Sequence, residues 1–111
     1  MKTQLTASES AKLIELGVSP GKANGLWLPG TDAIIPFALA DILDILPKEI
    51  KRNAYSNYTF NILADNHYWD VEYRYWGGDH ADDTLALFES EELIDALYSL
   101  LVWCLEKGYV K

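Results

Sequence analysis

Metal-binding chemistry has one candidate segment in this chain. Residues 79–83 (DHADD) follow two glycines and combine carboxylate and imidazole groups, which are common ligands of divalent metals. His67 could approach them across a hairpin. The spacing matches neither an EF-hand loop nor a two-histidine zinc motif, and the glycines fit an exposed turn equally well. A solvated acidic loop is therefore the simpler interpretation. The weak metal candidates are Asp79, His80, Asp82 and Asp83.

Nucleophilic chemistry also has one candidate, the single cysteine Cys104. It could act with His67 or His80 as its base. Cys104 lies, however, in an apolar segment, where a cysteine is usually a buried and inert thiol. The sequence contains no glycine-rich phosphate loop, no G-x-S-x-G elbow and no paired-cysteine zinc pattern. We therefore expect a protein that is not an enzyme, with no catalytic residue and no cofactor.

The charge of the chain argues against nucleic acids and membranes as direct partners. Seventeen carboxylates against nine Lys and Arg residues give a net charge of −8. Ten acidic residues and a single arginine, Arg74, lie between Asp65 and Asp95. A surface of this kind repels phosphates and anionic lipid headgroups. The candidate residues of this acidic surface are Asp79, Asp82, Asp83, Glu89, Glu91 and Glu92.

Composition predicts one folded domain over residues 1–111. Half of the residues are apolar and 13% are aromatic, which is enough for a substantial core. One cysteine cannot form an internal disulfide, which fits a reducing compartment. The first residues do not resemble a secretory signal, and no apolar run approaches the roughly 20 residues that span a bilayer. We expect a cytoplasmic protein.

Helices are expected at both ends of the chain. A capping box, Thr6 to Glu9, begins a helix over about 7–16. A Ser-Pro pair predicts a short helix over about 20–24. Apolar residues at helical spacing predict a third over about 38–46, with its aspartates outward. A long C-terminal helix over about 91–107 is capped by Ser90, with Glu91 and Glu92 in its first turn.

Between these helices the period of the apolar residues changes to two. Alternating runs over about 57–64 and 68–76 flank an Asp-Asn turn and predict a β-hairpin. Residues 84–88 fit a third strand. The sequence thus predicts an α+β domain, in which a three-stranded antiparallel meander is covered on one face by the helices.

The hairpin offers candidates for a protein interface. Alternation puts Trp69, Val71, Tyr73 and Tyr75 on one face and Tyr68 and Trp76 on the other. If the first face meets the helices, the second face exposes aromatic residues in a polar surrounding, as anchors of protein interfaces are. Alternatively, Trp76 folds over the edge of the sheet. The interface candidates are Tyr68, Trp76, Arg74 and Glu72.

Three stretches carry a resemblance to a known group. Residues 6–18 (TASESAKLIELGV), 37–50 (FALADILDILPKEI) and 92–107 (ELIDALYSLLVWCLEK) resemble small uncharacterised proteins encoded in prophages and mobile elements of gut bacteria. The resemblance spans most of the chain and consists of apolar and capping residues. It implies an accessory protein of a phage or mobile element, and it implies no activity and no site residue.

Three functions are compatible with these observations. The first is a non-catalytic interaction protein that self-associates, for example as a homodimer through the apolar last helix, or binds a protein partner through the outer face of the hairpin. The second is an acidic DNA mimic that inhibits a host nucleic-acid-binding protein. The third is a metal-dependent activity at the 79–83 loop.

Overall fold

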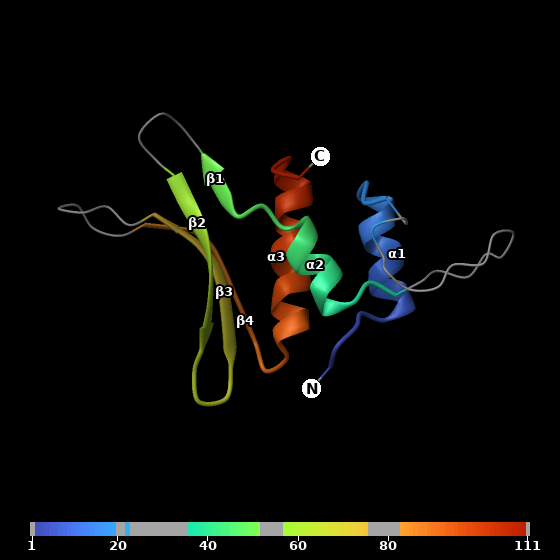
Figure 1. Ribbon diagram of the computed structural model, residues 1–111, viewed down its shortest axis with the longest axis horizontal. Helices are drawn as coiled ribbons and strands as arrows, with labels where there is room; N and C mark the ends of the chain where they lie inside the picture. Colours follow the sequence, from blue (N-terminus) through green and yellow to red (C-terminus); the bar gives the residue numbers. More distant parts are fainter. Residues whose placement is uncertain (1, 20–21, 23–35, 52–56, 76–82, 111) are drawn as a thin grey trace, which may run out of the picture.

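The predicted α+β class is confirmed by a computed structural model, which describes residues 2–19, 22, 36–51, 57–75 and 83–110. N-terminal helices precede a four-stranded sheet, and a long helix follows it (Figure 1). The predicted helix 20–24 falls outside the described residues except for Lys22. The elements are α1 (Ala7–Glu15), α2 (Leu39–Ile45), β1 (Glu49–Lys51), β2 (Asn57–Ala64), β3 (Trp69–Tyr75), β4 (Asp83–Ser90) and α3 (Leu93–Lys107).

The sheet is an antiparallel meander in the order β1-β2-β3-β4. The predicted hairpin is its centre, with Phe60 opposite Tyr73 and Ile62 opposite Val71. The prediction of three strands was wrong, because β1 is a fourth. A strand of three residues with only Ile50 buried is too short to show an alternating pattern. The register between β3 and β4 shifts between Tyr73 and Arg74, which marks a β-bulge.

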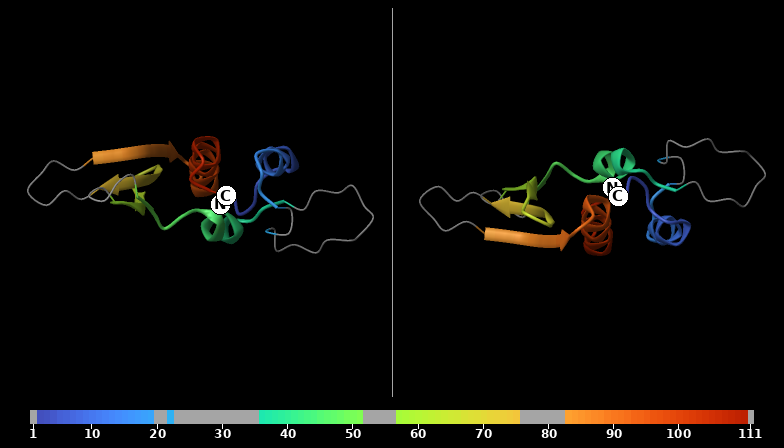
Figure 2. Two further views of the ribbon diagram at one scale, coloured as in Figure 1. Left: turned by 90° about the horizontal axis from the view of Figure 1, so that it is seen from above. Right: turned by 90° about the horizontal axis from the view of Figure 1, so that it is seen from below.

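The helices lie on one side of the sheet. Both figures show α2 and α3 next to the sheet and α1 beyond them (Figures 1 and 2). The core forms where α3 meets the inner face of the sheet: Val71 and Tyr73 are fully buried there, and so are Leu97 and Leu101 of α3. The face with Val71 and Tyr73 is therefore the one that meets the helices, which the alternating pattern alone left open.

Helix α1 begins as the sequence predicts. The Glu9 N–H donates to Thr6 Oγ1 at 3.1 Å, and the Thr6 N–H donates to Glu9 Oε1 at 2.9 Å, which completes the capping box. The Lys2 ammonium then joins this end of α1 to α3, with contacts of 3.1 Å to Glu9 and 2.7 Å to Asp95. Through these two ion pairs, the N-terminal segment contacts both α1 and α3.

Two helix starts differ from the prediction. Helix α3 begins at Leu93, two residues later than expected, because Glu92 has the extended backbone of an N-cap residue; its carboxylate accepts the Lys2 N–H at 2.9 Å. Ser90 Oγ still accepts the Glu92 N–H at 3.3 Å. In α2, Asp41 was expected to face outward but is buried, because its Oδ2 accepts the Ala38 N–H at 2.8 Å and so caps the helix.

Candidate functional site

Most of the predicted metal-binding loop falls outside the described residues, as do Asp79, His80, Asp82 and the interface candidate Trp76. Asp83 is described, and its Oδ2 accepts a hydrogen bond of 2.7 Å from the Tyr58 hydroxyl. No group of three His, Cys, Asp or Glu residues lies close enough to hold a metal within the described ranges. The metal site at 79–83 stays a prediction.

Cys104 is fully buried, as its apolar surroundings predict. Burial raises the pKa of the Cys104 thiol to about 11, and the nearby Tyr73 hydroxyl offsets only part of this effect. A thiol with such a pKa is almost wholly protonated at neutral pH, and the protonated form is a poor nucleophile. Cys104 therefore packs as a small apolar side chain between α3 and β3.

Glu72 does not belong to an exposed surface, contrary to the prediction. It lies on the outer face of β3, with Asn61 of β2 and Leu87 of β4 opposite it in register, yet only 1% of its side chain is exposed. Arg74, two residues along the same face, contacts Glu72 Oε2 at 3.2 Å. Because its neighbours and Arg74 cover it, Glu72 acts as a buried ion-pair partner of Arg74.

The predicted interface residues are not all close together. Tyr68 is exposed as expected, and its carbonyl accepts the Asp65 N–H at 2.8 Å in the turn before β3. Arg74 lies six residues later along the strand, or about 20 Å at the rise of an extended chain. Tyr68 and Arg74 thus lie at opposite ends of β3 and do not share one small patch.

The candidate residues of the acidic surface also lie apart from one another and have different surroundings. Glu89 lies opposite Asp70 on the outer face, where a side-chain hydrogen bond with Asp70 and the charges of Asp70 and Asp65 raise the pKa of Glu89. Glu91 is exposed next to α3. Glu92 is partly buried, and its Oε2 accepts a hydrogen bond from the backbone N–H of Lys2. Glu89 is therefore the candidate whose charged form is disfavoured by its acidic neighbours Asp70 and Asp65.

The open side of β4 is a feature that sequence reasoning missed. β4 is the last strand in the sheet order, and no strand in the described part of the chain pairs with its outer edge. Its residues 84–88 (TLALF) are uncharged, and Leu87 has the largest exposed fraction, 51%, among the large apolar side chains described as exposed. An edge of this kind presents unpaired backbone N–H and C=O groups to any neighbouring strand.

A shallow groove lies between β4 and α3. It encloses about 320 Å³, and Phe88 forms its wall on the β4 side. The α3 side presents Tyr98, Val102 and Trp103, all of them only partly buried. We call the outer edge of β4 together with this groove the β4 docking surface. The full lining of the groove is Phe88, Tyr98, Ser99, Val102, Trp103 and Glu106.

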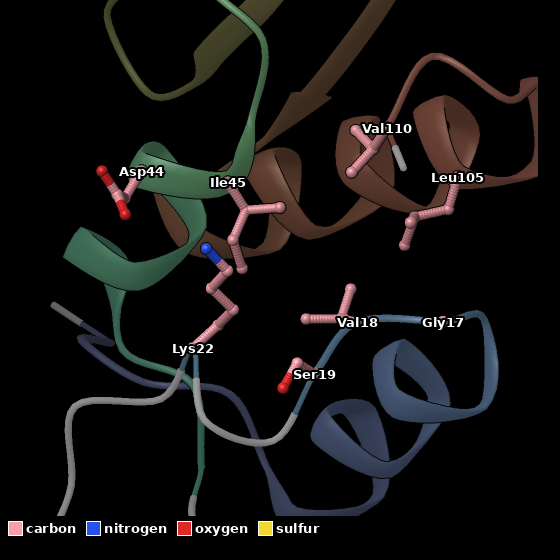
Figure 3. A pocket seen from close by; sticks show the side chains of 8 residues that line it. All are labelled: Gly17, Val18, Ser19, Lys22, Asp44, Ile45, Leu105 and Val110. Carbon is pink, nitrogen blue, oxygen red and sulfur yellow. The ribbon is translucent and has the colours of Figure 1, made fainter.

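A smaller pocket of about 220 Å³ opens between α1, α2 and the end of α3 (Figure 3). Val18, Ile45 and Val110 line it with apolar groups, and the Lys22 side chain extends along α2 near Ile45. Asp44 also lines the pocket, so it carries a carboxylate as well as the Lys22 ammonium beside its apolar groups. No sequence motif predicts the pocket, because three segments that are distant in the sequence line it.

Comparison with known proteins adds no identification. No family model matches the chain, no curated protein matches it, and no solved structure matches it. Among the described residues, no helix has the length and apolar character needed to cross a membrane. The site must therefore be interpreted from its own geometry.

Proposed function

We propose that this protein is a non-catalytic interaction protein that binds a protein partner through the β4 docking surface. The observation that carries the proposal is the combination of an open, uncharged strand edge with an apolar groove directly beside it. An added strand gains affinity from main-chain hydrogen bonds and gains specificity from pockets that receive alternate side chains. The β4 edge supplies the first element and the groove supplies the second.

The side chains of the groove support the same function. Tyr98 and Trp103 are partly buried, so part of each ring is still accessible from solvent. Aromatic residues of this kind are enriched among the anchors that contribute most to binding at protein interfaces. Buried apolar area contributes roughly 25 cal/mol per Å², so covering the groove and Leu87 would favour association.

Site-specific photocrosslinking in cells of the native host tests this proposal. A photoreactive amino acid replaces Leu87 on β4, and a matched variant carries it at Leu63 on β2. Both leucines lie on the outer face, and both are exposed, by 51% and 47% respectively. We expect a crosslinked adduct of defined mass at position 87 and none at position 63. A complete absence of adducts at position 87 would contradict the proposal.

An acidic DNA mimic is the second candidate function, and an origin in a phage or mobile element is compatible with either function. The exposed carboxylates of Asp65, Glu89 and Glu91 favour it, because spaced negative charges fit a basic groove. Salt separates the two candidates. A partner held by charge is released at about 1 M salt, where the Debye length is about 3 Å, whereas a partner on the β4 docking surface is retained.

A further inference from the structure

We infer that the occupant of the β4 docking surface is the β4 strand of a second copy of this chain, paired antiparallel about a two-fold axis at Leu87. This inference rests on the proposed function and names its partner. An isologous contact requires a surface that is complementary to itself. The β4 strand meets this requirement in both its side-chain pattern and its charge.

The side-chain pattern favours one register. In an antiparallel pairing about a two-fold axis perpendicular to the sheet, the numbers of any two opposite residues add to the same sum. This sum must be even, because opposite residues must lie on the same face. A sum of 174 places Leu87 opposite Leu87 and Ala86 opposite Phe88. Apolar residues therefore meet apolar residues, apart from Leu85 opposite Glu89.

The neighbouring registers are less favourable. A sum of 172 centres the pairing on the small Ala86 and places each exposed Leu87 opposite Leu85, the residue at the bulge. A sum of 176 places the exposed Leu87 opposite Glu89. The bulge at Leu85 interrupts the ladder with β3 but leaves Ala86–Ser90 regular, so the centre of the proposed pairing lies in undistorted strand.

The groove supplies the rest of the contact. Both views of Figure 2 show β4 and α3 on the same side of the molecule, with α2 on the opposite side. Phe88 belongs to the face of β4 that carries the groove. In the proposed register, Phe88 of one copy lies opposite the small Ala86 of the other and so reaches that copy's groove. Tyr98 and Val102 of the two α3 helices then approach each other.

Charge distinguishes a second copy from a basic partner. Each copy carries a net charge of −8, so two copies repel each other at long range. The central residues of the contact, 86–88, are uncharged and do not add to this repulsion, whereas Glu89 of each copy lies at its ends. Screening by salt should therefore strengthen self-association, whereas it would weaken the binding of a basic partner.

Sedimentation velocity of the purified chain tests the inference directly. We expect a monomer–dimer equilibrium whose dissociation constant falls as salt is raised. Leu87→Lys puts a charge at the centre of the pairing and should weaken the dimer at least about tenfold, or 1.4 kcal/mol. The matched variant Leu63→Lys, on the same face but away from the β4 edge, should leave dimerisation unchanged.

A cysteine variant tests the register. Directly opposed residues have Cβ atoms about 4.5–5.5 Å apart, close to the separation that a disulfide bridges. Leu87→Cys should therefore form a disulfide-linked dimer under mild oxidation, whereas Leu63→Cys should not. The native Cys104 is buried and gives no background.

Several outcomes overturn the inference. A wild-type chain that stays monomeric at every salt concentration excludes the second copy, as does a dimer that Leu87→Lys leaves intact. A dimer weakened equally by Leu87→Lys and Leu63→Lys places the contact on the sheet face instead. If the chain is monomeric but crosslinks from position 87 to another protein, the proposed function stands and only this inference fails.

Discussion

The Tyr73 hydroxyl donates a hydrogen bond of 2.8 Å to the carbonyl oxygen of Pro47. Tyr73 is fully buried in the middle of β3, and Pro47 lies between α2 and β1. The ring of Tyr73 also lies 6.4 Å from that of Trp103 on α3, centroid to centroid. One side chain of the sheet thus contacts both α3 and the segment that follows α2.

Removing only the hydroxyl of Tyr73 should cost stability. Tyr73→Phe keeps the ring packing but deletes the bond to Pro47, so we expect a loss of about 1 kcal/mol in the free energy of unfolding. Urea denaturation measures this loss. Tyr68→Phe is the matched control, because the Tyr68 side chain is exposed, and it should change stability by less than about 0.5 kcal/mol. Equal effects of the two substitutions would argue against a role for the bond.

The Cys104 thiol should be unreactive in the folded protein. Its pKa of about 11 leaves roughly a thousandth of the thiol as reactive thiolate at pH 8, and burial blocks access as well. A thiol reagent should therefore label Cys104 only at the rate of unfolding. The Leu63→Cys variant, which adds an exposed thiol away from the proposed contact, should label once immediately and a second time in urea. Rapid labelling of the native wild-type chain would contradict the described core.

The N-terminal capping box should contribute a pH-dependent part of the stability. Partial burial disfavours the charged form of Glu9, but hydrogen bonds from Thr6 and Lys2 outweigh it and lower the pKa of Glu9. Because the pKa of Glu9 is lower in the folded state, its contribution is present above the unfolded pKa near 4.5. It is lost as the pH falls through the folded value.

Substitution of Glu9 therefore has a distinct signature. Glu9→Gln should be less stable than the wild type at neutral pH, and the difference should shrink as the pH falls below about 4. Thr6→Ala should cost about 1 kcal/mol by removing the cap of α1. Thermal unfolding followed by circular dichroism at several pH values measures both effects. A Glu9→Gln difference that stays constant with pH would contradict the assignment.

Loss of Arg74 and loss of Glu72, the ion pair on the outer face, should lower the stability of the protein by different amounts. Arg74→Ala leaves the carboxylate of Glu72 buried without this cation, and we expect a loss of about 3 kcal/mol. Glu72→Leu removes the buried charge itself, while Arg74 has 29% of its side chain exposed and can reach water. We expect Glu72→Leu to cost less than Arg74→Ala in urea denaturation. The reverse order would show that Glu72 does not depend on Arg74.

Local patterns in the sequence predicted most of the elements of this fold. The capping box at Thr6 and Glu9 located α1, and alternation over 57–64 and 68–76 located β2 and β3. These predictions hold because each depends on neighbours within a few residues along the chain. The burial of Cys104 followed in the same way, from the apolar character of the helix that contains it.

Long-range contacts decided the features that the sequence did not reveal. Glu72 looks like a surface residue in its segment, and it is buried because β2 and β4 flank it with Asn61 and Leu87. Strand β1 exists because Ile50 pairs with Tyr58 of β2, and one buried residue leaves no periodic signal. Glu92, the N-cap of α3, likewise accepts a hydrogen bond from the Lys2 N–H, 90 residues away in the sequence.

The β4 docking surface is also a feature that contacts between distant segments decide. The sequence indicated a strand near 84–88 and an apolar last helix, but it did not show that β4 ends the sheet or that Phe88 faces Tyr98 and Trp103. Strand order and the placement of a helix on a sheet depend on which surfaces bury the most apolar area together. Only the tertiary structure leaves the β4 edge open, because pairing in a sheet is decided between segments and not within one.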